Sequence, residues 1–190
     1  DKKVYLKGVN QHHDLGALGA AFNLSAAKRQ LEVLKELGAN AIRMAHNPPD
    51  PKLLELTDEM GFLVIDELYD SWERKKNPLD FHLIFSDWSE QDIRAMVRRD
   101  RNHPSIIMWS TGNEVGEQYT GEDGAAIAKQ LRKYVLDEDP TRPITASMNY
   151  AKPNKYGFEQ IIVWASKSTL DNIHDKPWLK KCTHKFLEKN

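Results

Sequence analysis

Short apolar runs alternate with longer amphipathic segments along most of this 190-residue chain. This alternation limits the possible folds more than any other feature, because strands that alternate with helices form βαβ units and therefore a parallel sheet. Ser25 is the expected N-cap of the first helix, and Gly38 and Gly61 are the expected ends of the first two helices. Strands are predicted at residues 4–9, 41–45, 62–65, 105–110 and 143–147, and helices at residues 25–37, 53–60, 88–101 and 125–136.

Residues that can do chemistry follow the predicted strands. In a β/α barrel the active site lies at the carboxyl ends of the strands, so this placement predicts a (β/α)8 TIM barrel. A doubly wound open sheet is the alternative, but it usually has a glycine-rich phosphate loop after its first strand, and no such loop is visible here. The strand-end residues are His12, His46, the pair Asp66-Glu67 and the pair Asn113-Glu114.

The barrel pattern covers residues 1–153, and residues 154–190 depart from it. Residues 156–165 are apolar enough for one more strand, whereas the segment after them has no clear period. Only five βα units can be recognised, and a complete TIM barrel takes about 250 residues. We therefore expect the N-terminal half of a barrel, truncated to about the first five βα units. The abrupt start in a strand is typical of a piece of a larger protein.

The composition argues against several classes of partner. The formal net charge is −1, so nothing indicates binding to nucleic acid or to an anionic membrane. No apolar run reaches the length that spans a membrane, and the N-terminus does not resemble a secretory signal. The single cysteine, Cys182, rules out an internal disulfide and a thiolate metal cluster. The cellular compartment stays open.

Two long motifs resemble those of a known family. Residues 40–48 (NAIRMAHNP), with Asp58 and residues 61–64 (GFLV), resemble the first signature of glycoside hydrolase family 2, and residues 100–114 (DRNHPSIIMWSTGNE) resemble its second, acid/base signature. Residues 7–12 and 66–72 are also similar to the family pattern. The resemblance implies a retaining exo-β-glycosidase with a carbohydrate substrate. It also implies, as partners in the parent protein, the remaining half of the barrel and accessory sandwich domains.

The resemblance implies that Glu114 is the general acid/base. Glu114 would protonate the leaving oxygen and later take a proton from the attacking water. Asn113 would bind the sugar 2-hydroxyl, an interaction that strengthens in the transition state. Without the resemblance, Glu114 is an exposed carboxylate in a loop and Asn113 is a turn-forming asparagine.

Four further residues are candidate substrate contacts: Arg43, His46, His12 and Trp72. Arg43 lies inside an apolar strand and needs a carboxylate partner. The resemblance implies that Arg43 orients the nucleophile, and a structural ion pair with Asp66 or Glu67 is the alternative. The two histidines are similar to substrate-contacting residues of the family, or are ordinary polar residues. Trp72 would stack on a sugar face, or belong to a solvated, charged loop.

No metal site or other cofactor is expected. Some β-galactosidases of the family hold magnesium near the acid/base. The glutamate and histidine that bind this magnesium would fall near Ser71 and Glu73 in this chain, so the magnesium site is expected to be absent. The residue types that can bind a metal near the predicted site are His12, His13, Asp14, Asp66 and Glu67.

Only half of a retaining active site can be recognised. The mechanism needs a second carboxylate about 5–5.5 Å from the first. In the family this is a glutamate at the end of the seventh strand, and no acidic residue of this chain ends a seventh strand. We therefore expect the isolated chain to be nearly inactive. An inactive truncated product or a sugar-binding half-barrel is the alternative function.

The sugar is predicted by analogy. Residues 111–115 (TGNEV) and the loop at 76–78 (KNP) look more like those of β-galactosidases than of β-glucuronidases. A β-glucuronidase-type or β-mannosidase-type specificity is the alternative. An unclosed parallel sheet also exposes the edges of its outermost strands, so self-association is a further expectation.

Overall fold

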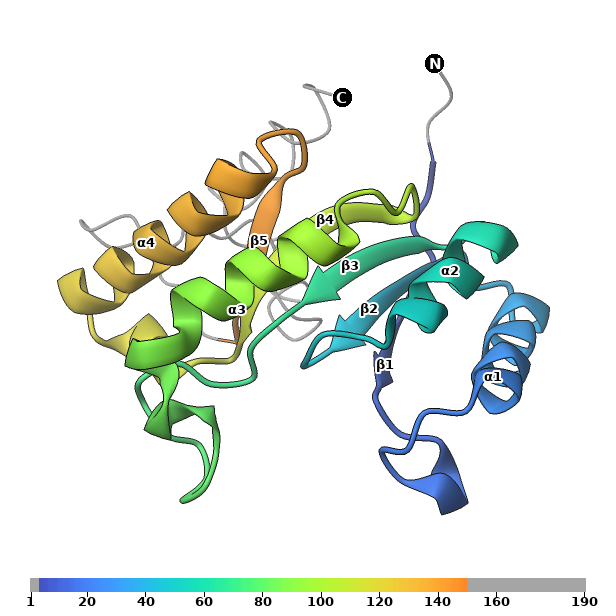
Figure 1. Cartoon of the computed structure of the whole chain (residues 1–190), viewed down its shortest axis with the longest axis horizontal. Helices are drawn as coiled ribbons and strands as arrows, with labels where there is room; N and C mark the ends of the chain where they lie inside the picture. Colours follow the sequence, from blue (N-terminus) through green and yellow to red (C-terminus); the bar gives the residue numbers. More distant parts are fainter. Residues whose placement is uncertain (1–3, 150–190) are drawn as a thin grey trace, which may run out of the picture.

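The computed structural model describes residues 4–149, in which strands and helices alternate (Figure 1). This order confirms the predicted succession of βα units. The possible strand at 156–165 and the tail at 154–190 lie outside the described residues. The strands are β1 (Gly8–His12), β2 (Ala41–Ala45), β3 (Leu63–Glu67), β4 (Ile106–Asn113) and β5 (Ile144–Ser147). The helices are α1 (Leu24–Glu36), α2 (Pro51–Met60), α3 (Phe85–Asp100) and α4 (Glu122–Glu138).

The five strands form one parallel sheet in the order β1-β2-β3-β4-β5. Each strand pairs with the next one in the sequence, and Arg43 lies opposite Asn10 on one side and Ile65 on the other. In Figure 1 helices α1, α2, α3 and α4 lie one after another along the sheet, in the same order as the strands. The strand order of the described residues never reverses, which excludes the doubly wound alternative for this part and matches the first five βα units of a TIM barrel. The outermost strands β1 and β5 each pair with one described strand, and self-association stays a prediction.

The first strand begins later than predicted. The side chain of Asn40 accepts a hydrogen bond from the Lys7 N–H at 2.7 Å and donates one to the Tyr5 carbonyl oxygen at 2.9 Å. Since β2 starts only at Ala41, Tyr5 and Lys7 bind this side chain in place of a neighbouring strand. The fourth strand is longer than predicted and extends to Asn113.

Helix boundaries follow from the capping groups. The Asn23 side chain accepts a hydrogen bond from the Ala26 N–H at 3.0 Å and caps α1, so the prediction of Ser25 as the cap is wrong. Gly61 ends α2, as predicted, with a φ of 69°. Glycine adopts this left-handed conformation at little steric cost, and the chain turns there directly into β3.

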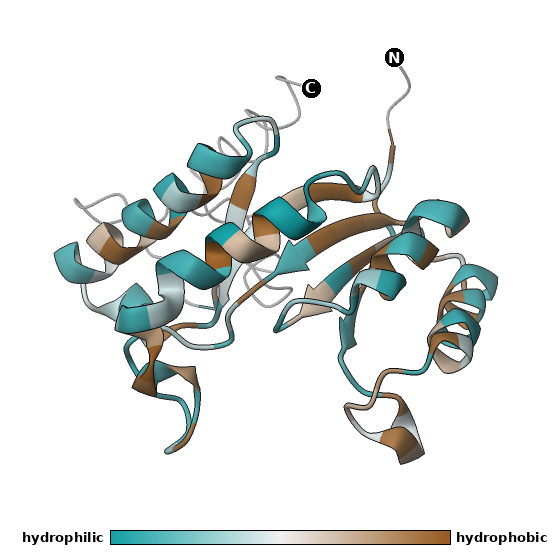
Figure 2. Ribbon diagram, viewed as in Figure 1, coloured by the Kyte–Doolittle hydropathy of each residue, from teal (hydrophilic) through white to brown (hydrophobic). Residues whose placement is uncertain are grey.

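The hydrophobic core lies between the sheet and the helices. Strand residues Ile42 and Val64 and helix residues Leu54, Ile93 and Val97 are at most 1% exposed. Figure 2 shows apolar strands beneath helices whose outward surfaces are hydrophilic, and the tip of β3 turns hydrophilic as well. This packed layer fixes the positions of the strand ends.

The opposite face of the sheet is less covered. Ile65 and Ile107 are partly exposed in the described part of the chain, and both line a cavity. In a complete TIM barrel this face is filled by inward side chains from all strands. A membrane-crossing helix is not found among residues 4–149, since none is long and apolar enough.

Candidate functional site

A cavity of about 640 Å³ lies along the less covered face of the sheet. It brings together four of the predicted site residues, Arg43, His46, Asn113 and Glu114. Arg43 lies on β2 and His46 directly follows that strand, whereas Asn113 is the last residue of β4 and Glu114 follows it. These residues meet because parallel strands end at the same edge of a sheet.

Glu114 is exposed and has an unusual backbone conformation. Its φ is 44°, in the left-handed region that costs a non-glycine residue on the order of 1 kcal/mol. Its N–H donates a hydrogen bond to the Ser147 carbonyl oxygen at 2.6 Å, which ties it to the end of β5. Such conformations persist where the surrounding structure maintains them, and they are concentrated in active sites.

Arg43 and Glu67 form a buried ion pair beside the cavity. The Nε and Nη2 atoms of Arg43 donate to the two carboxylate oxygens of Glu67 at 2.9 and 2.7 Å. Glu67 is fully buried and also accepts a hydrogen bond from the Ser110 hydroxyl at 2.6 Å. The predicted ion pair is confirmed with Glu67 as the partner, because Asp66 lies on the other side of β3, next to Asp100 of α3.

His46 is held against Glu67 in one tautomer. Its Nδ1 lies 2.8 Å from the Glu67 Oε1 and 3.2 Å from the Arg43 Nη2. A carboxylate can only accept, so Nδ1 carries the proton and donates it to Glu67. The Nε2 atom is then left for a ligand in the cavity. The ring of His12 packs edge-on against His46, with 4.9 Å between the ring centroids, but His12 itself does not line the cavity.

The Asn113 side chain is fixed between a base and an acid. Its Oδ1 accepts a hydrogen bond from the Arg43 Nη2 at 2.8 Å, and its Nδ2 donates one to the Asp70 Oδ1 at 2.9 Å. Turning the amide over would place NH2 against a guanidinium and oxygen against a carboxylate, so one orientation is favoured at both ends. One N–H and one lone pair of the amide stay available for a sugar hydroxyl.

Trp72 lies in the hydrophobic core and not in the cavity. Its side chain is fully buried, and the indole N–H donates to the Thr111 carbonyl oxygen at 2.8 Å. A Cβ atom at Gly112 would lie 2.8 Å from the Trp72 Nε1, so the ring packs directly against the backbone of β4. A buried ring has no face for a sugar. The structure therefore replaces the predicted stacking with a structural role, in which Trp72 supports the strand that ends at Asn113.

Asp70 and Lys76 lie next to Asn113 and were not among the predicted contacts. Both belong to the loop between β3 and α3, which has no period from which their positions can be deduced. The sequence marks Lys76 only as part of a loop similar to those of β-galactosidases. Within residues 4–149, no group of three or more His, Cys, Asp or Glu side chains is arranged to hold a metal ion.

Comparison with known proteins agrees with this geometry. The family model described as "Glycosyl hydrolases family 2, TIM barrel domain" matches residues 1–188. A beta-galactosidase from Bacteroides ovatus is 42% identical over 183 residues, which cover 80% of this chain and 21% of the relative. A beta-glucuronidase from Sus scrofa is 35% identical over 181 residues, which cover 92% of this chain and 26% of the relative.

Solved structures have a similar backbone. The crystal structure of a glycosyl hydrolase family 2 member from Bacteroides cellulosilyticus superposes with a TM-score of 0.81 at 39% identity, covering 86% of this chain and 21% of that one. The chain thus spans 21% to 26% of the length of these relatives. The family match, the identities and the strand-end site together show that the chain belongs to glycosyl hydrolase family 2 and contains part of its TIM-barrel domain.

Proposed function

We propose that this chain provides the acid/base side of the active site in a retaining exo-β-glycosidase whose preferred substrates are β-galactosides. The observation that supports this most strongly is the cavity shared by Arg43, His46, Asn113 and Glu114 at the strand ends. Relatives named as a beta-galactosidase and a beta-glucuronidase support hydrolysis of β-glycosidic bonds as the reaction.

Glu114 acts at two points in the proposed reaction. It donates its proton to the glycosidic oxygen as the aglycone leaves, and it then takes a proton from the water that hydrolyses the glycosyl-enzyme. Its exposed side chain fits this role, because the carboxyl must reach both the leaving group and water. The free N–H and lone pair of the Asn113 amide contact the sugar 2-hydroxyl, and His46 contacts the sugar through Nε2.

The nucleophile is a second carboxylate from outside residues 4–149. Glu67 is a carboxylate beside the cavity, but its oxygens already accept hydrogen bonds from Arg43, His46 and Ser110, so it has little capacity to attack. Within residues 4–149, the Nη1 atom of Arg43 makes only one long contact, of 3.4 Å, to Asn10. It is a strong donor with capacity for an incoming carboxylate, which fits a role in orienting the nucleophile.

The charge of the cavity favours a neutral sugar. Arg43 is the only lysine or arginine among the described residues that line it, and Glu67 neutralises that charge. The carboxylate of a uronic acid is bound best by an unpaired cation, which this side of the site does not offer. We therefore expect β-galactosides to be cleaved faster than β-glucuronides, with β-mannosides as the third option.

The test is a panel of aryl β-galactosides, β-glucuronides and β-mannosides assayed with the full-length protein that contains this chain. Loss of the acid/base in Glu114→Ala should lower turnover by about 10²- to 10⁴-fold. Azide, a nucleophile that needs no general base, should restore turnover and give a glycosyl azide of retained configuration. Hydrolysis by Glu114→Ala at the wild-type rate, with no glycosyl azide formed, would overturn the proposal.

The alternative of an inactive half-barrel is tested with the 190-residue chain itself. We expect no turnover of any aryl glycoside by this chain, because the described residues supply no nucleophile. Robust turnover that Glu114→Gln abolishes would mean that the chain contains its own nucleophile. Full-length protein without turnover would instead support the sugar-binding alternative.

A further inference from the structure

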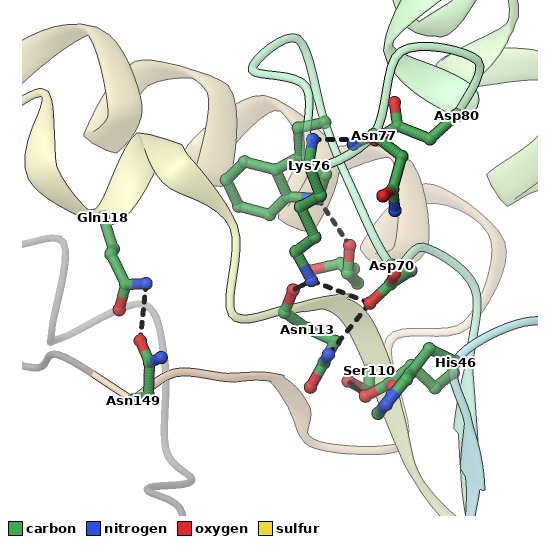
Figure 3. Close-up of polar contacts among 12 residues, drawn as sticks. His46, Asp70, Lys76, Asn77, Asp80, Ser110, Asn113, Gln118 and Asn149 are labelled. Atoms are coloured by element: carbon green, nitrogen blue, oxygen red, sulfur yellow. Dashed lines mark hydrogen bonds and ion pairs between the residues drawn. The ribbon is translucent and has the colours of Figure 1, made fainter. Parts of the chain in front are cut away.

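The loop between β3 and α3 brings a lysine to the backbone of the site. The Nζ of Lys76 donates to the Asp70 Oδ1 at 2.7 Å and to the Asn113 carbonyl oxygen at 2.6 Å. Since Asp70 also accepts from the Asn113 side chain, the three residues form a closed ring of hydrogen bonds. Figure 3 shows the Lys76 side chain extending from its loop to a point between Asp70 and Asn113.

Lys76 binds the peptide group that precedes Glu114. The carbonyl oxygen of Asn113 and the N–H of Glu114 belong to one planar unit. Lys76 holds the oxygen of this unit at 2.6 Å, and the Ser147 carbonyl holds its N–H at 2.6 Å. Rotation of the plane changes the φ of Glu114, which is 44°, and therefore changes the direction in which its side chain leaves the backbone. A glutamate keeps this unfavoured φ only where contacts of this kind stabilise it.

The loop is organised so that Lys76 reaches this position. The Asp80 Oδ2 accepts hydrogen bonds from the N–H groups of Lys76 and Asn77, each at 2.7 Å, and its Oδ1 accepts one from the His82 N–H at 3.0 Å. Burial acts to raise the pKa of Asp80, but the N–H groups of Asn77 and His82 outweigh it and lower the pKa. Asp80 thus stays charged and closes the loop around the Lys76 backbone.

Asp70 completes the ring as a charged partner. Burial acts to raise the pKa of Asp70, but the hydrogen bonds from Lys76 and Asn113 lower it. The carboxylate therefore attracts the Lys76 ammonium and fixes the Asn113 amide together. The adjacent lysine, Lys75, is exposed and offers a matched comparison for the same loop.

From these contacts we infer that Lys76 is a positioning residue for the acid/base catalyst, because it holds the peptide between Asn113 and Glu114 and so aims the Glu114 carboxyl at the leaving oxygen. The inference rests on the proposed function of Glu114. It adds a residue that does not line the cavity. A displaced acid slows the reaction only where the leaving group needs a proton. We therefore expect the loss of kcat/KM in a Lys76 variant to depend on the leaving group.

The test is kcat/KM of Lys76→Met in the full-length protein, with two β-galactosides that differ only in the leaving group. Phenol is a poor leaving group that needs the acid, whereas 2,4-dinitrophenolate leaves without a proton. We expect a fall of about 100-fold for the phenyl galactoside, the effect of a displacement of about 1 Å. We expect almost no change for the dinitrophenyl galactoside. Lys76→Arg, which retains the cation, should recover much of the loss.

Two further variants make the result decisive. Lys75→Met is the matched control and should leave both substrates at the wild-type rate. Asp70→Asn breaks the same ring from its other side and should show the leaving-group dependence again. Equal losses for both substrates in Lys76→Met and Asp70→Asn, or no loss with either substrate, would overturn the inference.

Glu114→Gln distinguishes this inference from the proposed function. If Glu114→Gln lacks the leaving-group dependence, the proposed acid is wrong and the inference fails with it. If Glu114→Gln shows the dependence and Lys76→Met does not, the proposed function stands and only the role of Lys76 is refuted.

Discussion

The two faces of the sheet contribute different things to the molecule. Toward the helices, Val64, Ile93 and Val97 have no exposed surface. Toward the cavity, Ile65 and Ile107 are partly exposed in the described part of the chain, and the strand ends hold charged and amide groups. We infer that the packed face supplies most of the stability and the open face supplies the chemistry.

The comparison shows how the five described strands can hold an ordered site. The backbone of β4 is fixed from the packed face, where Trp109 is fully buried and donates a hydrogen bond to Asp139 at 2.9 Å. Trp72 packs against the same strand at Gly112. Glu114, at the end of this strand, can therefore be exposed and still have a defined position.

One isoleucine on each face tests the comparison most strongly. Ile93→Ala removes a fully buried side chain from α3, and we expect the free energy of unfolding to fall by about 4 kcal/mol. Ile107→Ala removes a partly exposed side chain from the cavity face, and we expect a loss of about 1 kcal/mol. Urea unfolding followed by circular dichroism measures both. Equal losses would contradict the division between the faces.

Glu67→Gln tests a residue that lies on the open face but is fully buried. The substitution leaves Arg43 without its counter-charge, so the expected loss is about 3 kcal/mol in the same unfolding assay. The double variant Arg43→Met/Glu67→Gln should cost less than the sum of the single variants, because it removes both charges together. Additive losses would mean that the two side chains do not stabilise one another.

Asp66 is an exception on the packed face, because it is a buried acid. Neither of its oxygens accepts a hydrogen bond from a described donor. Burial, and then the negative charge of Asp100, raise the pKa of Asp66 well above its ordinary value. The folded protein therefore keeps a proton here that the unfolded chain releases above about pH 4. Stability is lost as the pH rises from that point toward the raised pKa.

Asp66→Asn should remove this pH-dependent loss of stability. Its stability relative to the wild type should increase as the pH is raised from about 4, measured by urea unfolding at several pH values. A difference that does not change with pH would contradict the buried proton.

Asp139→Asn is the control of opposite sign. Burial acts to raise the pKa of Asp139, but hydrogen bonds from Thr141, Arg142 and Trp109 outweigh it and lower the pKa. The stability that this carboxylate contributes is present above about pH 4 and is lost as the pH falls. The advantage of the wild type over Asp139→Asn should therefore shrink in acid.

Much of the fold and part of the site could be predicted from the sequence. Apolar periodicity is a local property, so it was sufficient for the succession of strands and helices. Strand-end position was sufficient to bring His46, Asn113 and Glu114 together. The partner of Arg43 was left open between two acids, and only the alternation of side chains along β3 decides it, since Asp66 and Glu67 point to opposite faces.

The loop between β3 and α3 could not be predicted in the same way. Lys76 contacts Asn113, which lies 37 positions further along the chain, and a loop without a period gives no sign of such a contact. From the sequence, the charged neighbours of Trp72 indicated that this residue is exposed, either in a solvated loop or against a sugar. Only its packing against the backbone at Gly112 decides that the ring is in the core.

The free energy of unfolding and kcat/KM, both measured for Glu114→Gln, test most directly whether this glutamate contributes to catalysis and not to stability. We expect the free energy of unfolding of the 190-residue chain to change by less than about 0.5 kcal/mol, because the side chain is exposed. We expect kcat/KM of the full-length protein for phenyl β-galactoside to fall by about 10²- to 10⁴-fold. A clear loss of stability with kcat/KM unchanged would contradict both expectations.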